Sequence, residues 1–328
     1  MKTSIQKRTR LTNLTTFKVS HIAILMALVT MFVAGCARVE NTIATPTPVQ
    51  PVTLVDSLGR EVTIATPPKR IISLAASNTE IIFAIGAGDR LVGRDDYSDY
   101  PADVVNVESI GSLYPHVNAE VIVALEPNLV LAAGITNPED VAALDKLGLT
   151  VYTTSVASSF NEIYADILAI GTLTGENSGA ETVVKNMKDR VQAVAELTKN
   201  VSHRPTVFYE IDATDPYKPW TSGPGSFIDI LITTAGGDNV GASSEKAYWQ
   251  ISVEELVEQD PQIIVLGSSK YSGQTPELVS QRPGWGQISA VTTANVHPFD
   301  DDLVSRPGPR LVEGLETLAK IIHPKIFE

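Results

Sequence analysis

Residues 118–131, NAEVIVALEPNLVL, and residues 252–265, SVEELVEQDPQIIV, are two versions of one structural unit. Each version starts with a residue type that favours a helix N-cap, places a carboxylate in the first helical turn, and ends in a proline and an apolar run. The glutamates Glu120 and Glu254 are 134 positions apart, and so are the two prolines. A helix and a strand that recur once in each half of the chain predict two related lobes.

Short β-branched runs alternate with helical patterns on both sides of this unit, which predicts α/β lobes with mainly parallel sheets. The predicted strands are Arg70–Leu74, Leu129–Ala132, Val151–Thr154, Thr206–Ile211, Ile263–Leu266 and Val296–Phe299. The predicted helices are Thr79–Ala87, Ala119–Leu125, Pro138–Leu147, Phe160–Leu173, Ser226–Ala235, Val253–Glu258 and Pro309–Ile322. Between the halves, Asn177–Lys199 has one apolar stripe at helical spacing and predicts a connector between lobes. An ordinary surface helix of one large domain would show the same periodicity.

The composition limits the class of protein. A chain of 328 residues, 43% hydrophobic and 19% charged, suggests about two globular domains and excludes a disordered tail or a multi-span membrane protein. The net charge of −13 argues against nucleic acid as a partner, because phosphate binding needs concentrated Lys and Arg. The single cysteine, Cys36, excludes a disulfide framework within the chain and a cysteine-based zinc cluster.

Residues 1–36 have the pattern of a lipoprotein export signal. Five basic residues and no acidic residue precede Cys36, and the apolar run 22–35 is too short to span a bilayer comfortably. Residues 33–36, VAGC, resemble a bacterial lipobox, in which the cysteine is lipidated and becomes the new N-terminus. A membrane anchor with an incidental cysteine is the alternative. Removal of residues 1–35 would shift the net charge from −13 to −18, and the Thr- and Pro-rich residues after Cys36 predict an extended tether.

The paired glutamates also have a simpler interpretation. A carboxylate in the first helical turn is favoured by the helix dipole by roughly 0.3–1 kcal/mol. In the second unit, Glu255 stands three residues after Ser252 and could complete a capping box. Neither Glu254 nor Glu120 stands at the position that such a box requires.

From Thr53 to Glu328 the chain resembles the periplasmic-binding family that delivers vitamin B12, haem and iron–siderophore complexes to ABC importers, and its pattern is nearest to the vitamin B12 (cobalamin) binding proteins. The resemblance rests on the opening segment DSLGREVTIATPPKRIISLAASNTEIIFAIGAGDRLVG, on YSDYP, on both glutamate units and on SRPGPRLVEGLETLA near the end. The chain departs from the family at Ala76, where a proline is usual.

The resemblance implies an α/β fold with two Rossmann-like lobes, a single long backbone helix joining them and a ligand cleft between them. The implied segments are a signal at 1–35, a tether at 36–51, an N-terminal lobe at 52–173, the connecting helix at 174–202 and a C-terminal lobe at 203–328. It also implies an exported, lipid-anchored monomer, on the outer side of the cytoplasmic membrane or in the periplasm. Such a protein is not an enzyme and has no resident cofactor, since the bound chelate is cargo.

The expected partners are an ABC permease dimer with its cytoplasmic ATPase, a small metal-chelate ligand and the membrane, through the lipid on Cys36. Glu120 and Glu254 match the exposed glutamates with which family members meet arginines on the two permease subunits. A repeated acidic group on two related lobes suits a two-fold permease, because equivalent surfaces must present equivalent charges. Docking is therefore preferred to capping as the role of this pair.

The loops that the resemblance places at the cleft are aromatic, which suits a large flat ligand. They contain Tyr97, Tyr100, Tyr114, Trp220, Tyr248 and Trp249, although core packing is an alternative for each of them. Tyr97, Trp220 and Tyr248 match cleft positions of vitamin B12-binding relatives, whereas Tyr114 lies where those relatives often carry Trp. Asp302 and Arg306 match polar cleft residues, and Arg306 could bind a ligand phosphate or carboxylate or hold Asp302. The preferred ligand is cobalamin or another corrinoid.

An iron–siderophore complex or haem is the alternative ligand within the family. Siderophore clefts often contain several arginines, and the loops here offer mainly Arg282, Arg306 and Arg310. No His, Met or Tyr is nominated as an axial haem ligand. A free zinc or manganese site is disfavoured because His116, His203, His297 and His323 show no paired spacing.

An extracellular hydrolase is the alternative from a different class of protein. It would need a nucleophile with its base, and the chain has neither G-x-S-x-G nor H-E-x-x-H. Residues 223–226, GPGS, could cradle an anion at a helix start or could simply begin the helix.

Overall fold

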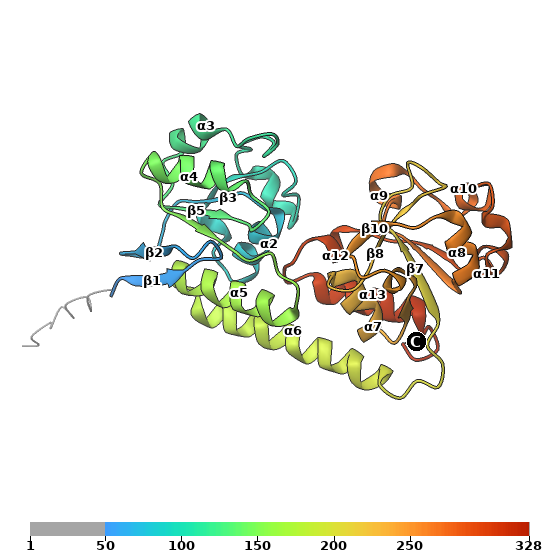
Figure 1. Cartoon of the computed structure of the whole chain (residues 1–328). Coiled ribbons are helices and arrows are strands. Elements are labelled where there is room, and N and C mark those ends of the chain that lie inside the picture. The colour runs from blue at the N-terminus through green and yellow to red at the C-terminus, as the bar shows by residue number, and fades with distance from the viewer. Residues whose placement is uncertain (1–49, 328) are drawn as a thin grey trace, which may run out of the picture. The chain divides into compact units, whose positions relative to one another are not determined.

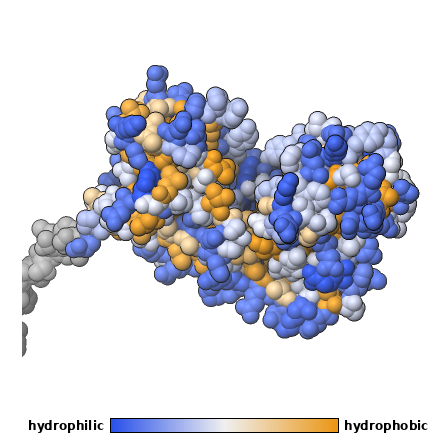
Figure 2. Space-filling model, in the orientation of Figure 1, coloured by the Kyte–Doolittle hydropathy of each residue, from blue (hydrophilic) through white to orange (hydrophobic). Residues whose placement is uncertain are grey.

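The computed structural model describes residues 50–327. The predicted export signal and nearly all of the predicted tether, including Cys36, lie outside the described residues. Within 50–327, no helix combines the length and the apolar character needed to cross a membrane. In the view of Figure 2 the surface is mostly hydrophilic, and apolar residues form separate patches.

The N-terminal lobe contains a parallel sheet with the strand order β4–β3–β5–β6. Its strands are β3 (Ile71–Ser73), β4 (Leu91–Arg94), β5 (Leu129–Ala132) and β6 (Val151–Thr153), and its helices are α2 (Ala76–Ala84), α3 (Ala119–Ala124), α4 (Pro138–Lys146) and α5 (Phe160–Thr174) (Figure 1). One face of the sheet packs on α2 and α5, and the other packs on α3 and α4. Because both faces are covered, the central strands β3 and β5 are buried at every residue, whereas the edge strand β4 alternates between buried and half-buried residues. An antiparallel hairpin, β1 (Val52–Val55) and β2 (Glu61–Ile64), precedes the sheet.

The C-terminal lobe repeats this plan with the strand order β12–β11–β7–β9. Its strands are β7 (Thr206–Glu210), β9 (Asp238–Asn239), β11 (Ile263–Leu266) and β12 (Val296–Pro298), and a separate two-stranded ribbon contains β8 (Trp220–Ser222) and β10 (Tyr248–Gln250). Its helices are α7 (Phe227–Thr234), α8 (Val253–Gln259), α9 (Ser269–Ser272), α10 (Pro276–Ser280), α11 (Ser289–Thr292), α12 (Asp302–Ser305) and α13 (Leu311–Ile322). Residues of α7 and α13 pack on one face of the sheet, and residues of α8, α10 and α11 pack on the other.

Helix α6 (Asn177–Thr198) lies between the two lobes in the chain, where the connector was predicted. Its 22 residues span about 33 Å. The predicted stripe is buried at Ala180, Val184, Met187 and Val194. Near its start, α6 packs against the end of α2 so closely that a Cβ atom at Gly179 would lie 2.1 Å from the Ile85 carbonyl oxygen. Two parallel α/β sheets and one long helix between them confirm the predicted fold class, whereas the lobe boundaries at 173 and 203 stay predictions.

The repeated unit is the same in both lobes. The pair α3–β5 and the pair α8–β11 occupy matching positions, and their strands begin 134 residues apart, at Leu129 and Ile263. After each helix one non-glycine residue adopts a left-handed conformation, Glu126 with φ 45° and Asp260 with φ 42°, just before the proline. Because non-glycine residues adopt this conformation uncommonly, its presence at equivalent positions supports the relationship between the lobes.

Helix α2 differs from its predicted range. It covers Ala76–Ala84, three residues earlier at both ends than the predicted 79–87. Its N-cap residue, Ala75, makes no side-chain cap hydrogen bond, so the usual sequence signal for a helix start is missing. Ala76, where the family usually has proline, is the first residue of α2. Proline suits that position because the first N–H of a helix has no intrahelical partner, and alanine suits it as well.

Candidate ligand-binding site

Three of the six predicted ligand residues lie in segments that follow the carboxyl ends of parallel strands. Tyr97 follows β4, while Asp302 and Arg306 follow β12. In α/β sheets, ligands bind outside the carboxyl ends of the strands, because the loops there converge on one edge. The topology of both lobes therefore places these residues at the expected edge.

Two of the predicted aromatic residues lie on one face of the β8–β10 ribbon. Trp220 pairs with Gln250, and Tyr248 pairs with Ser222 two positions further along, so both rings project from the same side. Trp220 is 40% exposed and Tyr248 is 56% exposed, so neither is a core residue.

The opposite face of this ribbon is fixed to the lobe. The Thr221 hydroxyl donates to the Tyr209 carbonyl oxygen at 2.8 Å, and the Trp249 indole N–H donates to the Gly241 carbonyl oxygen at 3.0 Å. The ribbon thus holds Trp220 and Tyr248 as an exposed aromatic surface on a fixed support.

The aromatic residues of the N-terminal lobe differ in their surroundings. Tyr97 and Tyr114 are 64% and 86% exposed. Tyr97 follows buried Asp95, whose carboxylate accepts from the Tyr97 N–H at 3.2 Å and also from the Ser98 hydroxyl. Burial raises the pKa of Asp95, although these hydrogen bonds oppose the shift. The Tyr100 ring is engaged by the Arg310 guanidinium, which lies 4.0 Å from the ring centroid.

Two exposed apolar side chains at the same edge of the N-terminal sheet were not predicted. Ile135 follows β5 and is 83% exposed, and Val156 follows β6 and is 67% exposed. Their loops touch, because a Cβ atom at Gly134 would lie 2.5 Å from Val156 Cγ2. An isolated isoleucine or valine in a loop carries no sequence signal for ligand binding.

Asp302 is a buried carboxylate at the start of α12. It is 3% exposed, accepts from the Tyr271 hydroxyl at 2.6 Å and from Lys270, and lies 2.8 Å from Arg306. Burial alone would raise the pKa of Asp302, but the hydrogen bonds from Lys270 and Tyr271 and the charge of Arg306 outweigh it, and the pKa is lowered. Asp302 therefore stays ionised. Lys270 and Tyr271 were not predicted, because the contact joins segments about thirty residues apart.

Arg306 joins the two lobes. Its guanidinium lies 2.8 Å from Asp302 in its own lobe, and 2.6 Å from Asp99 and 3.4 Å from Glu80 in the N-terminal lobe. Glu80, which is 3% exposed, also accepts two hydrogen bonds from Arg310 at 2.7 and 3.0 Å. We call these five residues the interlobe ion cluster. The alternative role for Arg306, that it holds Asp302, is confirmed, but the contacts of Arg306 with Glu80 and Asp99 were not predicted.

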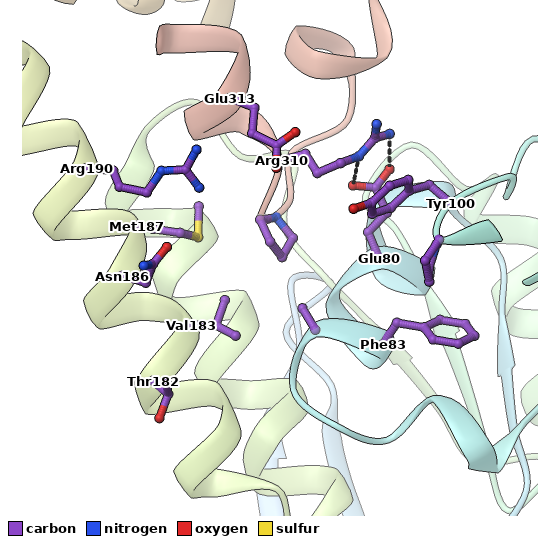
Figure 3. A pocket seen from close by; sticks show the side chains of 13 residues that line it. Glu80, Phe83, Tyr100, Thr182, Val183, Asn186, Met187, Arg190, Arg310 and Glu313 are labelled. Atoms are coloured by element: carbon purple, nitrogen blue, oxygen red, sulfur yellow. Dashed lines mark hydrogen bonds and ion pairs between the residues drawn. The ribbon is translucent and has the colours of Figure 1, made fainter. Parts of the chain in front are cut away.

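A cavity of about 500 Å³ adjoins this cluster (Figure 3). Its lining comes from α2, from the Tyr100–Pro101 segment, from α6 and from the start of α13. In Figure 3 the Glu80–Arg310 ion pair and the Tyr100 ring lie together on one side, facing Met187 and Arg190 of α6 across the cavity. The predicted residues Tyr97, Tyr114, Trp220 and Tyr248 are not part of this lining.

The paired glutamates lie where the repeated unit predicted them. Glu120 and Glu254 are both exposed and both occupy the first turn of their helix. The caps are made by Asn118, which accepts from the Val121 N–H at 3.3 Å, and by the equivalent Ser252. Among the described contacts, neither glutamate side chain bonds to its own helix.

Glu255 does not complete the predicted capping box. Its N–H donates to the Ser252 hydroxyl at 3.2 Å, which is one half of the box. Its carboxylate accepts instead from the Ser243 hydroxyl at 3.2 Å.

Two α/β lobes, one connecting helix and an exposed aromatic face on the β8–β10 ribbon define a two-lobed solute-binding protein. The chain belongs to the periplasmic binding protein family, whose model matches residues 71–303.

The chain is similar along most of its length to proteins of this class. An ABC transporter substrate-binding lipoprotein of Bacillus subtilis is 36% identical over 312 residues, which cover 92% of this chain and 96% of that protein. A cobalamin-binding protein of Halobacterium salinarum is 31% identical over 279 residues, covering 83% of this chain and 74% of that protein. The crystal structure of the periplasmic vitamin B12 binding protein of Vibrio cholerae matches with a TM-score of 0.66 at 28% identity, covering 78% of this chain and 97% of that one.

The protein is therefore the substrate-binding component of an ABC transporter, in the family that includes vitamin B12, haem and siderophore binding proteins. It is a transport component rather than an enzyme, which rejects the hydrolase alternative, and it acts outside the cytoplasm. A permease, an ATPase and a small ligand follow as its partners.

Proposed function

We propose that the cargo of this protein is a corrinoid, with cobalamin as the first candidate. The observation that carries the proposal is the aromatic face of the β8–β10 ribbon, where Trp220 and Tyr248 project together and stay exposed. Large flat ligands gain most from such rings, which bury extensive area on stacking. Relatives named as cobalamin- and vitamin B12-binding proteins, 31% identical to this chain, support the same cargo. The chelate is carried as cargo and is not a resident cofactor.

Absorption spectroscopy tests this proposal directly. Purified protein is mixed with cobalamin, haemin or a ferric siderophore, desalted, and examined for the retained chromophore. We expect the corrinoid band to be retained at about one ligand per protein. Retention of haemin or of the ferric siderophore alone would assign the cargo to the alternative ligands of the family.

Replacing both ribbon aromatics should weaken cobalamin binding strongly. Loss of a well-buried aromatic contact costs about 1.5–3 kcal/mol, so Trp220→Ala and Tyr248→Ala should each raise the Kd about tenfold or more. Titration calorimetry measures the effect. The control is Leu197→Ala, which removes a 52% exposed apolar side chain near the end of α6. Unchanged affinity in the double variant would show that the ribbon face does not hold the cargo.

We propose that Glu120 and Glu254 dock the protein, as a monomer, onto a two-fold permease. Their exposure, their equivalent positions in α3 and α8 and the assignment of capping to Asn118 and Ser252 support this role. Each lobe then presents a glutamate at the same helix position to one of two equivalent permease subunits.

We also propose that Cys36 is lipidated and holds the protein at the membrane. The apolar run and the VAGC motif, which ends in Cys36, support this, together with the lipoprotein name of the Bacillus relative. In cells, Cys36→Ser should move the protein from the membrane fraction to the soluble fraction and remove label from a supplied fatty acid. Because Cys36 is the one cysteine of the sequence, mass spectrometry of the mature N-terminus checks that the lipid is attached there. Continued membrane association of the unlabelled Cys36→Ser protein would favour an uncleaved N-terminal anchor.

A further inference from the structure

Arg306 is surrounded by carboxylates of its own protein. Three of them, Glu80, Asp99 and Asp302, lie within 3.4 Å of its guanidinium, and Arg306 is itself only 9% exposed. An anionic group of the cargo that approached Arg306 would therefore meet three negative charges. It can bind this arginine favourably only if one of the three leaves.

The three carboxylates differ in how easily they can leave. The side chains of Glu80 and Asp302 are 2% and 4% exposed, whereas that of Asp99 is 54% exposed. Glu80 is also held by Arg310, and Asp302 by Lys270 and Tyr271. Among the described contacts, the Asp99 carboxylate bonds to Arg306 alone. Because a buried charge without a partner is costly and an exposed one is not, Asp99 is the residue that can turn into water.

The charge balance around Arg306 favours replacement of Asp99 by the cargo anion over binding of the anion beside all three carboxylates. In the interlobe ion cluster, three carboxylates (Glu80, Asp99 and Asp302) face two cations, Arg306 and Arg310. Lys270 and Asp300, which lie 3.1 Å apart beside it, add one charge of each sign. The cluster already carries one negative charge in excess, and a cargo anion would add a second. Departure of Asp99 as the anion arrives keeps the balance unchanged.

We propose that Asp99 stands in for the cargo's anionic group in the free protein and is displaced by it on binding. This inference rests on the proposed corrinoid cargo and on the cleft position of Arg306 that the sequence resemblance implies. The recognised chemistry is an oxyanion on the chelate, either a phosphodiester or a carboxylate. The exchange needs only the Asp99 side chain to turn, because buried Asp95 still holds the Tyr97 N–H and the Ser98 hydroxyl. Tyr100 stays in place because its ring is held against Arg310.

The first test compares two corrinoids that differ in the anion. Cobalamin carries a phosphodiester in its nucleotide loop, and cobinamide lacks that loop. Asp99→Asn removes the competing charge, so it should bind cobalamin about two- to fivefold more tightly than the wild type, the range expected for a partly exposed ion pair. Its affinity for cobinamide should not change. The control, Asp103→Asn, removes an exposed charge without a described ion pair and should leave both affinities unchanged.

Salt dependence supplies an independent readout. In the wild type one ion pair replaces another, so the Kd for cobalamin should change little between ~0.05 and ~0.5 M NaCl. In Asp99→Asn an ion pair is gained on binding, so affinity should fall as salt rises. Equal salt slopes in the two proteins would overturn the exchange.

Other results would also overturn the proposal. Weaker cobalamin binding by Asp99→Asn would show that Asp99 contacts the ligand. An equal gain in affinity for cobalamin and cobinamide would show that the phosphodiester is not the group that competes with Asp99. If the wild type binds neither corrinoid, the proposed cargo is wrong, and haemin compared with its dimethyl ester repeats the test with carboxylates.

Titration of inorganic phosphate, followed through the Arg306 side-chain N–H signal by NMR, needs no cargo. In Asp99→Asn the Arg306 signal should shift at a lower phosphate concentration than in the wild type. Identical titration curves for the two proteins would contradict the proposal.

Discussion

Reversing the charge at both Glu120 and Glu254 is expected to abolish cargo uptake while leaving cargo affinity intact. The two side chains lie exposed on matching helices of the two lobes, and the described contacts give them no structural partner. Lysine at both positions would face the cationic docking residues expected on the permease, and like charges across an interface cost several kcal/mol. Uptake of labelled cargo by cells, and binding by the purified variant, measure the two effects separately.

A matched variant separates docking from net charge. Glu139→Lys with Glu277→Lys changes the total charge by the same amount at two other exposed first-turn positions, in α4 and α10, and should leave uptake unchanged. Each single reversal, Glu120→Lys or Glu254→Lys, should reduce uptake less than the pair does. Uptake at the wild-type rate in the double variant, or a loss of uptake in the control, would contradict the docking role.

Removing the carboxylate of Glu210 is expected to destabilise the C-terminal lobe more than any exposed substitution. Glu210 is fully buried at the end of β7, where it accepts from Arg282 through both oxygens and from the Ser268 hydroxyl at 2.7 Å. The Arg282 guanidinium also packs 4.5 Å from the Trp285 ring centroid. Glu210→Leu leaves Arg282 buried without its partner, at a cost of about 3–5 kcal/mol. Thermal unfolding followed by circular dichroism should show a Tm lower by roughly 6–20 °C.

A double variant removes the unpaired buried charge that Glu210→Leu leaves on Arg282. Glu210→Leu combined with Arg282→Met replaces both ions by apolar groups and should recover most of the lost stability. The exposed pair Lys185–Asp189 on α6 gives the opposite control, since both side chains are more than 60% exposed. Asp189→Asn should change the free energy of unfolding by no more than about 0.5 kcal/mol. If Glu210→Leu behaves like Asp189→Asn, the buried pair contributes little.

The elements that the sequence predicted well are those with strong local signals. β5 and β11 have the predicted bounds, because both are apolar runs between a proline-ended helix and a loop. The elements that were not predicted are short, among them β4, the β1–β2 hairpin and the β8–β10 ribbon. β5 and β11 are also only four residues long, but a proline-ended helix before each of them marks where the strand begins. The unpredicted strands follow no such helix, and their pairing partners decide whether they form.

In the candidate site, too, local contacts could be predicted from the sequence and contacts between distant segments could not. Arg306 and Asp302 are four residues apart, and their contact follows from helical spacing. The contact between Arg306 and Glu80 joins positions 226 residues apart, so no local pattern indicates it. The aromatic residues could be named in advance, but their exposure on one ribbon face depends on the pairing of β8 with β10.

By itself, the sequence determined the α/β class, the doubled unit, the long helix and the two glutamates, because periodicity, capping and repeat spacing are properties of neighbouring residues. The tertiary structure alone decided that Arg306 is shared by three carboxylates, that Asp99 is the exposed one among them, and that Trp220 and Tyr248 face outward. Burial and ion pairing depend on which distant segments the fold brings together, and desolvation then sets which charges are held and which can move.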